Sequence, residues 1–313
     1  MTVPDPARRP PDGPRRPRRR WWLVPLALLL AAPVGVSWYF TAPLEEKGGG
    51  PAGEPDRAPV DPARPVAAAP LAAWPEGRLE GDPAKAILLE SARHAVDRLE
   101  RVEYYTATFR RQERIGGTLG PLIVSRLKVR NRPFAIYLKY LAPKEGKEVV
   151  YAEGHRENKV LAHNGDWTRR LIPRLAVAPD SALALADTRH PVTDAGLLNL
   201  GRKLLRFREL DMGDEHATTI LDRSTADDGR PCLRSFHAHA KRDDGRPFRE
   251  VEILYDPATR VPFQIKSYDW PGPDHAGPLD LAERYTYDDL KLDAPLTAAD
   301  FDPANPEYAF MRF

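Results

Sequence analysis

Two histidines at alternate positions are the best candidates for metal ligation in this sequence. His237 and His239 fall within the run Cys232–Ala240, which has the composition of a strand, and side chains two residues apart on a strand point to the same face. Both imidazoles could therefore reach one ion, with Asp243 or Asp244 folding back toward it. Because a zinc site ordinarily uses at least three protein ligands and the spacing fixes no third one, we expect no metal site. Instead, we expect the two histidines on the solvated face of an antiparallel strand.

A third histidine, His190, marks a candidate functional loop ahead of a predicted helix. As a general base it would need a partner carboxylate, and the sequence identifies none. We therefore favour the alternative, a histidine that hydrogen-bonds to backbone near a helix start. Cys232 is the only cysteine, which excludes an internal disulfide. Since no lysine or histidine partner can be assigned to Cys232, we expect a packed thiol and not a nucleophile.

Other signals of chemistry are weak. The sequence has no GxSxG, P-loop or HExxH motif and no GxGxxG after a strand. Four aspartates lie near prolines in the C-terminal part of the chain, and we expect them in turns and caps: Asp288, Asp289, Asp300 and Asp302. We predict no catalytic residues, no cofactor and no enzymatic activity.

Five aromatic residues are candidates to line an apolar ligand cavity: Tyr137, Tyr140, Tyr151, Trp167 and Trp270. Each of them fits the filled core of a sheet equally well. A pattern of apolar residues cannot separate a filled core from a hollow one, so both interpretations stay open.

The elements that would position these residues form an α+β pattern. Asp82-Pro83 resembles an N-cap followed by a first-turn proline, and an apolar stripe predicts a helix over residues 83–102. A second helix, capped by Thr193, carries the apolar residues between Leu197 and Phe207. Period-two patterns and turn residues predict strands at 105–112, 122–130, 134–140, 149–153, 159–163, 218–222, 232–240, 250–255, 262–268 and 281–287. This order predicts a large curved antiparallel sheet and excludes a doubly wound parallel one.

The N-terminal part has a different composition. Residues 1–20 contain seven arginines, and the rest of the chain has 40 basic and 43 acidic side chains, so no nucleic-acid partner is expected. Residues 21–40 are an uncharged run of 20, long enough as a helix to span about 30 Å of hydrocarbon. Arginines before this run predict a cytoplasmic tail over 1–20. We favour an uncleaved membrane anchor over the two alternatives, a cleaved secretory signal and a buried helix.

The membrane segment is followed by residues 41–81, which are rich in Pro, Gly and Ala and predict a disordered linker. The ordered domain is expected over residues 82–313. The anchor would hold this domain in the periplasm or another extracytoplasmic space, and signal cleavage would make it a secreted protein.

The order of several short strings resembles that of a known superfamily. They are Tyr105-Thr-Ala-Thr-Phe-Arg-Arg-Gln112, Arg130-Asn-Arg-Pro-Phe134, Tyr140-Leu-Ala-Pro-Lys144 and His163-Asn-Gly-Asp-Trp167. In this order they resemble the LolA/LolB-like lipoprotein-carrier superfamily of bacterial envelopes. The strings Thr188–Leu197 and Phe301–Phe310 look like those of an uncharacterised branch of that fold, a domain of unknown function. The resemblance covers about residues 83–313.

The resemblance implies an unclosed β-barrel with helices covering the concave face, and a hollow that in the carriers holds acyl chains. The sequence departs from the soluble carriers in its predicted anchor over residues 21–40 and in a longer midsection, 173–210. Together with that anchor, the resemblance favours a membrane-tethered, non-enzymatic envelope protein whose partner is a lipid, a lipoprotein or another apolar ligand. The alternative is a structural or interaction module whose hollow is filled by its own helix around Leu197–Phe207. A hydrolase that uses His190 is a weaker third hypothesis. No ligand-contacting arginine of the carriers can be aligned here, so none is transferred.

Overall fold

The computed structural model describes residues 71–165, 174–242, 246–272 and 276–311. The predicted cytoplasmic tail, the predicted anchor over 21–40, linker residues 41–70 and Trp167 lie outside these ranges. Within them, no helix combines the length and the apolar character that crossing a membrane requires.

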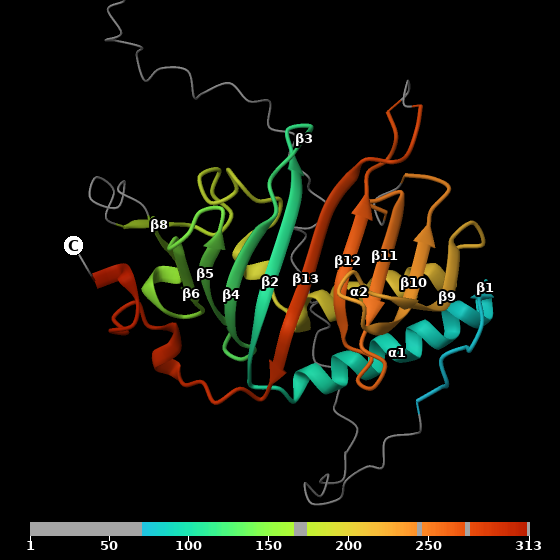
Figure 1. The fold of residues 1–313 in the computed structure, drawn as a ribbon, viewed down its shortest axis with the longest axis horizontal. Helices are drawn as coiled ribbons and strands as arrows, with labels where there is room; N and C mark the ends of the chain where they lie inside the picture. The colour runs from blue at the N-terminus through green and yellow to red at the C-terminus, as the bar shows by residue number, and fades with distance from the viewer. Residues whose placement is uncertain (1–70, 166–173, 243–245, 273–275, 312–313) are drawn as a thin grey trace, which may run out of the picture. The chain divides into compact units, whose positions relative to one another are not determined.

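The described residues form thirteen strands and two α-helices (Figure 1). In chain order these are β1 (Leu79–Glu80), α1 (Asp82–Glu100), β2 (Tyr104–Ile115), β3 (Thr118–Leu119), β4 (Ile123–Arg130), β5 (Ala135–Ala142), β6 (Glu148–Ala152), β7 (Val160–His163), β8 (Leu175–Val177), α2 (Leu197–Met212), β9 (Thr218–Thr225), β10 (Pro231–Ala238), β11 (Glu250–Tyr255), β12 (Pro262–Tyr268) and β13 (Leu281–Leu292). The predicted strands are confirmed, and β1, β3 and β8 are additional short ones.

All strands belong to one antiparallel sheet. Its order is β1-β9-β10-β11-β12-β13-β2-β4-β5-β6-β7-β8, with β3 paired only to β2. Most neighbours are also neighbours in sequence, but the central pair joins β2 to β13, far apart in the chain (Figure 1). Within the described chain β1 and β8 end the sheet without pairing to each other. The predicted α+β class, with a curved, unclosed antiparallel sheet, is therefore confirmed.

Both helices lie on the concave face and pack against each other there. Val96, Leu99, Leu197 and Leu198 of the helices share one core with strand residues such as Val129. Leu99 and Leu197 have no exposed surface. Burying a leucine fully contributes about 1.5–3 kcal/mol, so these contacts fix the helices on the sheet.

The start of α2 differs from the prediction. Thr193 lies in a short 3₁₀ helix, Val192–Asp194, and α2 begins after Gly196. Gly196 has φ +100°, and a Cβ there would lie 3.1 Å from the Tyr105 hydroxyl. That hydroxyl accepts a hydrogen bond from the Leu197 N–H at 2.7 Å. A buried tyrosine of β2 thus takes the capping role that we predicted for Thr193.

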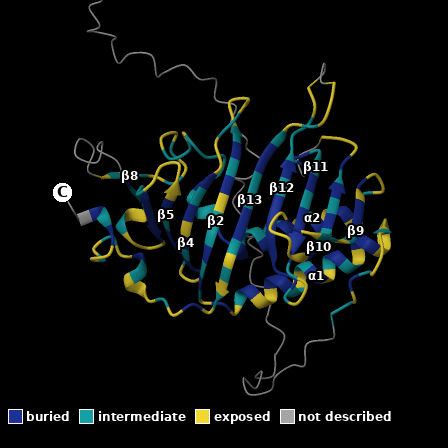
Figure 2. Ribbon diagram, in the orientation of Figure 1, coloured by how far each residue is buried: buried dark blue, intermediate teal, exposed yellow. Residues whose placement is uncertain are grey.

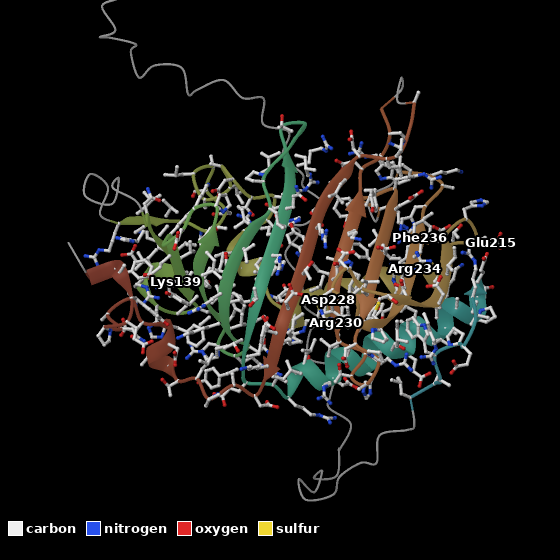
Figure 3. All side chains as sticks on the ribbon, in the orientation of Figure 1. Lys139, Glu215, Asp228, Arg230, Arg234 and Phe236 are labelled. Atoms are coloured by element: carbon white, nitrogen blue, oxygen red, sulfur yellow. The ribbon has the colours of Figure 1, made fainter. Side chains whose placement is uncertain are left out.

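The other face of the sheet is covered only in part. Over β5 and β6, the C-terminal segment adds Phe301, Tyr308 and Phe310 to a second core. Over β10 the face is open enough to carry half-buried polar residues, among them Arg234, which Figure 3 labels with Phe236. Figure 2 shows buried and half-buried residues along most of the strands, with exposed residues concentrated at the turns between them.

The ordered fold takes in the end of the segment that we predicted as linker. Trp74 is buried, donates its indole N–H to the Asp222 carbonyl at 2.8 Å and lies 5.7 Å from the Tyr255 ring. Leu79 and Glu80 then pair with β9. Residues 71–81 therefore cover the β9 edge of the sheet.

Candidate functional site

His237 and His239 do not lie on a solvated face, and that prediction was wrong. Both are buried, because α2 packs over the face of β10 that they share. The guanidinium of Arg208 contacts His237, and the Ser235 hydroxyl lies 3.0 Å from its Nε2. Burial, together with Arg208 and Arg246, lowers the pKa of His239 to about 3 and that of His237 well below its usual value. Within the described ranges, no three His, Cys, Asp or Glu side chains are grouped closely enough to hold a metal ion.

His190 has the carboxylate partner that the sequence did not reveal. Its Nε2 lies 2.8 Å from an Oε2 of Glu283 on β13. Arg189 reaches the same carboxylate, with Nε to Oε2 at 3.3 Å. The expectation that His190 only bonds backbone near a helix start is therefore corrected. His190 and Glu283 are 93 positions apart in the sequence, so their contact depends on the tertiary fold.

A second buried carboxylate, that of Glu113 on β2, lies beside Glu283 on β13. We name Glu113 and Glu283 the acidic pair. The two are register partners. Arg111 lies 2.6 Å from Glu113, and the Arg189 N–H donates to the same carboxylate at 3.3 Å. The segment Asp187–His190 is thereby held against the concave face by both members of the acidic pair.

The charges around Glu283 favour its ionised form. Burial by itself would raise the pKa of Glu283, but His190 and Arg189 outweigh burial and leave that pKa below its usual value. Tyr285 donates its hydroxyl to Glu113 at 2.5 Å, and burial beside both carboxylates raises its pKa well above the usual range. The Tyr285 phenol therefore keeps its proton and can donate it in a hydrogen bond to a carboxylate oxygen.

Charged residues on an apolar face were the signal that could have revealed this cluster. Tyr105, Ala107 and Phe109 alternate on the predicted buried face of β2, and the same alternation continues to Arg111 and Glu113. A charge that continues a buried face must be paired, since an unpaired buried charge is very costly. The sequence therefore contained a reason to search for partners of Arg111 and Glu113.

The aromatic candidates do not meet in one place. Tyr140 and Tyr151 belong to the concave core. Tyr137 lies on the opposite face, stacked on Tyr308 with ring centroids 4.0 Å apart. Trp270 follows β12 and donates its indole N–H to the Arg246 carbonyl at 3.0 Å. Trp167 lies outside the described residues.

A cavity of about 290 Å³ opens beside one of these residues, Tyr151. It lies between the β4–β5 turn, β6 and the first turn of α2. Apolar walls come from Phe134, Tyr151 and Leu198, and two arginines contribute positive charge, Arg132 and Arg202. The remaining lining is Asn131, Glu153, Thr193, Ala195, Gly196 and Asn199.

The remaining candidates have structural roles. Cys232 is a buried free thiol, and burial is the main cause that raises its pKa. Asp300 completes a capping box with Thr297, as expected for a cap. Asp302 accepts the Ala304 N–H at 2.9 Å in a turn. The other two aspartates instead lie on strand β13 and bond to β2: Asp288 to Arg110 and Asp289 to Thr108.

Several solved structures are similar to this chain at low identity. A DUF1329 family protein from Desulfovibrio piger has 11% identity and a TM-score of 0.35, covering 71% of this chain and 98% of its own. The lipoprotein LppX from Mycobacterium tuberculosis has 14% identity and a TM-score of 0.38, covering 71% and 100%. A LolA superfamily protein from Nitrosomonas europaea has 8% identity and a TM-score of 0.26, covering 69% and 97%. At such TM-scores these likenesses carry no inference about a ligand.

A match to a protein family is more direct. No curated protein matches the chain, but the family model of a domain of unknown function, DUF1571, matches residues 102–310. This range includes the acidic pair, the cavity and both longer strings that suggested an uncharacterised branch. The match confirms that recognition, and the chain belongs to the DUF1571 family of proteins of unknown function.

Proposed function

We propose that this protein is a non-enzymatic binding protein that takes the apolar end of an amphiphilic ligand, such as a lipid acyl chain, into the cavity beside Tyr151. The observation that carries the proposal is the make-up of this cavity. Phe134, Tyr151 and Leu198 form one apolar wall that suits an acyl chain. The rest of the lining is mostly polar, and Arg132 and Arg202 are placed in it to orient an anionic headgroup.

The position of the cavity supports the same function. It lies where α2 begins, at one margin of the core that the helices form with the sheet. Enlarging it needs movement of the η4 segment Val192–Asp194 and of the first turn of α2. A volume of about 290 Å³ is at the lower end of pockets for small ligands, so a long chain would enter only in part.

A second function, a self-filled interaction module, is favoured by one observation. The α2 residues Leu197 and Leu198 lie inside the concave core, so the helix already fills much of the space that a carrier leaves for its ligand. In this alternative the cavity is only the end of a packed interface. A cavity-filling substitution separates the two functions.

A hydrolase has less support. His190 and Glu283 form a hydrogen-bonded pair, but the Glu283 side chain is only 5% exposed. The same carboxylate already accepts contacts from Arg189 and Ser267. A general base must reach a substrate proton, and this cluster is occupied by its own chain.

The test uses the full-length protein and a fluorescent fatty-acid probe. We expect saturable uptake by the native chain and at least tenfold weaker binding by Ala195→Trp, which places an indole in the cavity. Leu183→Trp is the matched control, because Leu183 is 57% exposed and its variant should bind as the native chain does. Thr193→Trp provides a second filling variant if Ala195→Trp fails to fold, as judged by circular dichroism.

Two results would contradict binding in this cavity. One is the absence of saturable probe uptake by the native chain. The other is equal uptake by the native chain and by folded filling variants. If the native chain takes up no probe and a cavity-filling variant is as stable as the native chain, the self-filled module is favoured.

The location of the domain outside the cytoplasm, behind an anchor at residues 21–40, is part of this proposal. Its support is the length of the uncharged run and the arginines that precede it. N-terminal sequencing of the protein recovered from the cell envelope tests it. An intact N-terminus is expected for an anchor, and a start beyond residue 30 would indicate a cleaved signal.

A further inference from the structure

One glutamate outside the cavity lining contacts both of the arginines within that lining. Glu100 is the last residue of α1, whereas Arg132 and Arg202 line the cavity beside Tyr151. Nη2 of Arg202 lies 2.8 Å from Oε1 of Glu100. Arg132 donates from its Nη2 to the backbone carbonyl of the same glutamate. The two cations of the cavity are thus tied to a single neighbouring residue.

The end of α1 is capped without the carboxylate of Glu100. Asn131, in the turn between β4 and β5, donates its side-chain amide to the Leu99 carbonyl at 3.0 Å and to the Val102 carbonyl at 2.8 Å. Arg132 takes the Glu100 carbonyl. A negative side chain at the C-terminal end of a helix is unfavourable, because the helix dipole is negative there. The position of this carboxylate therefore needs another reason than helix capping.

The contact between Glu100 and Arg202 is weak enough to be exchanged. The Glu100 side chain is 38% exposed and the Arg202 side chain 44%, and an exposed ion pair contributes little to stability because water screens both charges. Within the part of the chain that the structure describes, this is the only hydrogen bond or ion pair of the Glu100 carboxylate. Rotation of the glutamate side chain into solvent would therefore free the Arg202 guanidinium at a small cost.

The charges of the cavity lining and its partner are balanced. The lining contains two arginines, Arg132 and Arg202, and one carboxylate, that of Glu153. Glu100 supplies a second carboxylate from outside the lining. Because a charge that leaves bulk water has to be paired, an anionic headgroup can enter this balanced group without an excess of negative charge only if one carboxylate moves away.

Of the carboxylates near the cavity, Glu100 is the one that can move away. Oε2 of Glu153 accepts the Phe134 N–H at 2.8 Å and so holds the backbone at the start of β5. Asp194, in the η4 segment, is paired with Lys203 at 2.6 Å, and both side chains of that pair are less exposed than that of Glu100. The Glu100 carboxylate holds no backbone group, so its departure leaves the walls of the cavity in place.

We propose that Glu100 is an internal counter-ion that the anionic headgroup of the ligand displaces from Arg202. This inference rests on the proposed function and specifies its ligand class, an amphiphile with a carboxylate or phosphate headgroup. The headgroup oxygens take the donors that the Glu100 carboxylate leaves, since guanidinium groups form charge-assisted, bidentate hydrogen bonds with carboxylates and phosphates. A neutral headgroup cannot replace the charge of that carboxylate, so it binds less tightly.

Three probes of equal chain length separate the contribution of the headgroup from that of the chain. Dodecanoate, dodecyl phosphate and dodecanol are each titrated into the full-length protein and followed by isothermal titration calorimetry. Both anions should bind at least tenfold more tightly than dodecanol. Tighter binding of dodecanoate indicates a fatty acid as the source of the headgroup, and tighter binding of dodecyl phosphate indicates a phosphate ester. Equal affinity for all three probes would overturn the inference and leave the proposed function standing, whereas binding of none would contradict both.

Glu100→Gln tests the displacement directly. It removes the competing charge and keeps the shape of the side chain, so the ratio of dodecanoate affinity to dodecanol affinity should rise about twofold to fivefold, the range that an exposed ion pair accounts for. Asp97→Asn is the matched control, because it removes an exposed carboxylate one turn earlier on α1 and should leave this ratio unchanged. No rise in Glu100→Gln, or an equal rise in both variants, would overturn the inference.

The double variant shows whether Glu100 acts through Arg202. Arg202→Gln should lower the same ratio at least threefold, and adding Glu100→Gln to it should have no further effect, because the carboxylate then has no guanidinium to occupy. Residues in direct contact are non-additive in this way. An equal effect of Glu100→Gln with and without Arg202 would contradict the displacement. Arg202→Lys, which keeps the charge but lacks the paired donors, replaces Arg202→Gln if the latter fails to fold, as judged by circular dichroism.

Discussion

Glu113 and Glu283 stand directly opposite each other on β2 and β13, and the hydroxyl of Tyr285 lies between them. It is 2.5 Å from Glu113 and 3.4 Å from Glu283. Like charges opposite each other destabilise a sheet unless other groups compensate them. Here Arg111, Arg189 and His190 compensate both, and they come largely from the segment that connects the meander to α2. The central strand pair of the sheet is thus also the anchor of that segment.

Tyr285→Phe should destabilise the fold by about 1–3 kcal/mol, since it leaves a buried carboxylate of Glu113 without its phenol donor. Urea unfolding followed by circular dichroism measures the change. Tyr268→Phe on the neighbouring strand β12 is the control and should have a smaller effect. Equal effects of the two substitutions would show that the phenol does not support the acidic pair.

Lowering the pH should reduce the free energy of unfolding, because Glu283 becomes protonated. The folded-state pKa of Glu283 lies below its ordinary value of 4.5 because of His190 and Arg189. A carboxyl with a depressed folded-state pKa stabilises the fold above its unfolded-state pKa and loses that contribution as the pH falls through the folded-state value. Unfolding free energies measured between pH 6 and pH 3 should therefore fall below about pH 4.5.

The variant that tests this origin is Glu283→Gln. It should be less stable than the native chain at pH 6 and should lose less stability on acidification. Glu250→Gln, at a half-buried glutamate of β11, should retain the full acid dependence. An unchanged acid dependence in Glu283→Gln would assign the effect to other carboxyls, such as Asp187, whose pKa is lowered by Lys144 and Lys147 despite its burial.

Trp74→Ala should destabilise the fold by about 3–5 kcal/mol, the usual cost of truncating a buried aromatic residue. The substitution also removes the indole donor to Asp222 and frees the segment that covers the β9 edge. Hydrogen exchange should therefore accelerate first in β9. Leu71→Ala, at a half-buried residue three positions earlier, should change neither quantity by a comparable amount.

Tyr137→Ala and Tyr151→Ala should have different effects, because the two tyrosines lie on opposite faces of the sheet. Tyr151 lines the cavity, so its loss should weaken uptake of the fatty-acid probe. Tyr137 packs on Tyr308, so its loss should lower stability and release the C-terminal segment without changing uptake per folded molecule. A fall in uptake for both variants would place the ligand elsewhere.

Cys232 should react slowly with a thiol reagent in the native state and rapidly in denaturant. Its side chain is 2% exposed, and burial raises its pKa, so little reactive thiolate is accessible. The rate of colour release from an aromatic disulfide reagent measures this. Rapid reaction under native conditions would show that the β9–β10 end opens readily.

The sequence determined the local structure of the ordered domain. Pro83 and the apolar stripe through Leu99 predict α1, and alternation from Tyr105 to Phe109 predicts β2, because both periodicities are local properties of the chain. The order of strands and helices was sufficient for the α+β class and, with the family strings, for the unclosed sheet. No long-range contact was needed for either conclusion.

Only the tertiary structure decided which face of each strand is covered. Period-two alternation shows that His237 and His239 share a face, but α2 decides that this face is buried. In the same way, the C-terminal segment turns Tyr137 into a core residue of the opposite face. Glu113 and Glu283 meet because β13 returns to pair with β2, and a pairing between distant segments leaves no periodic trace in either one.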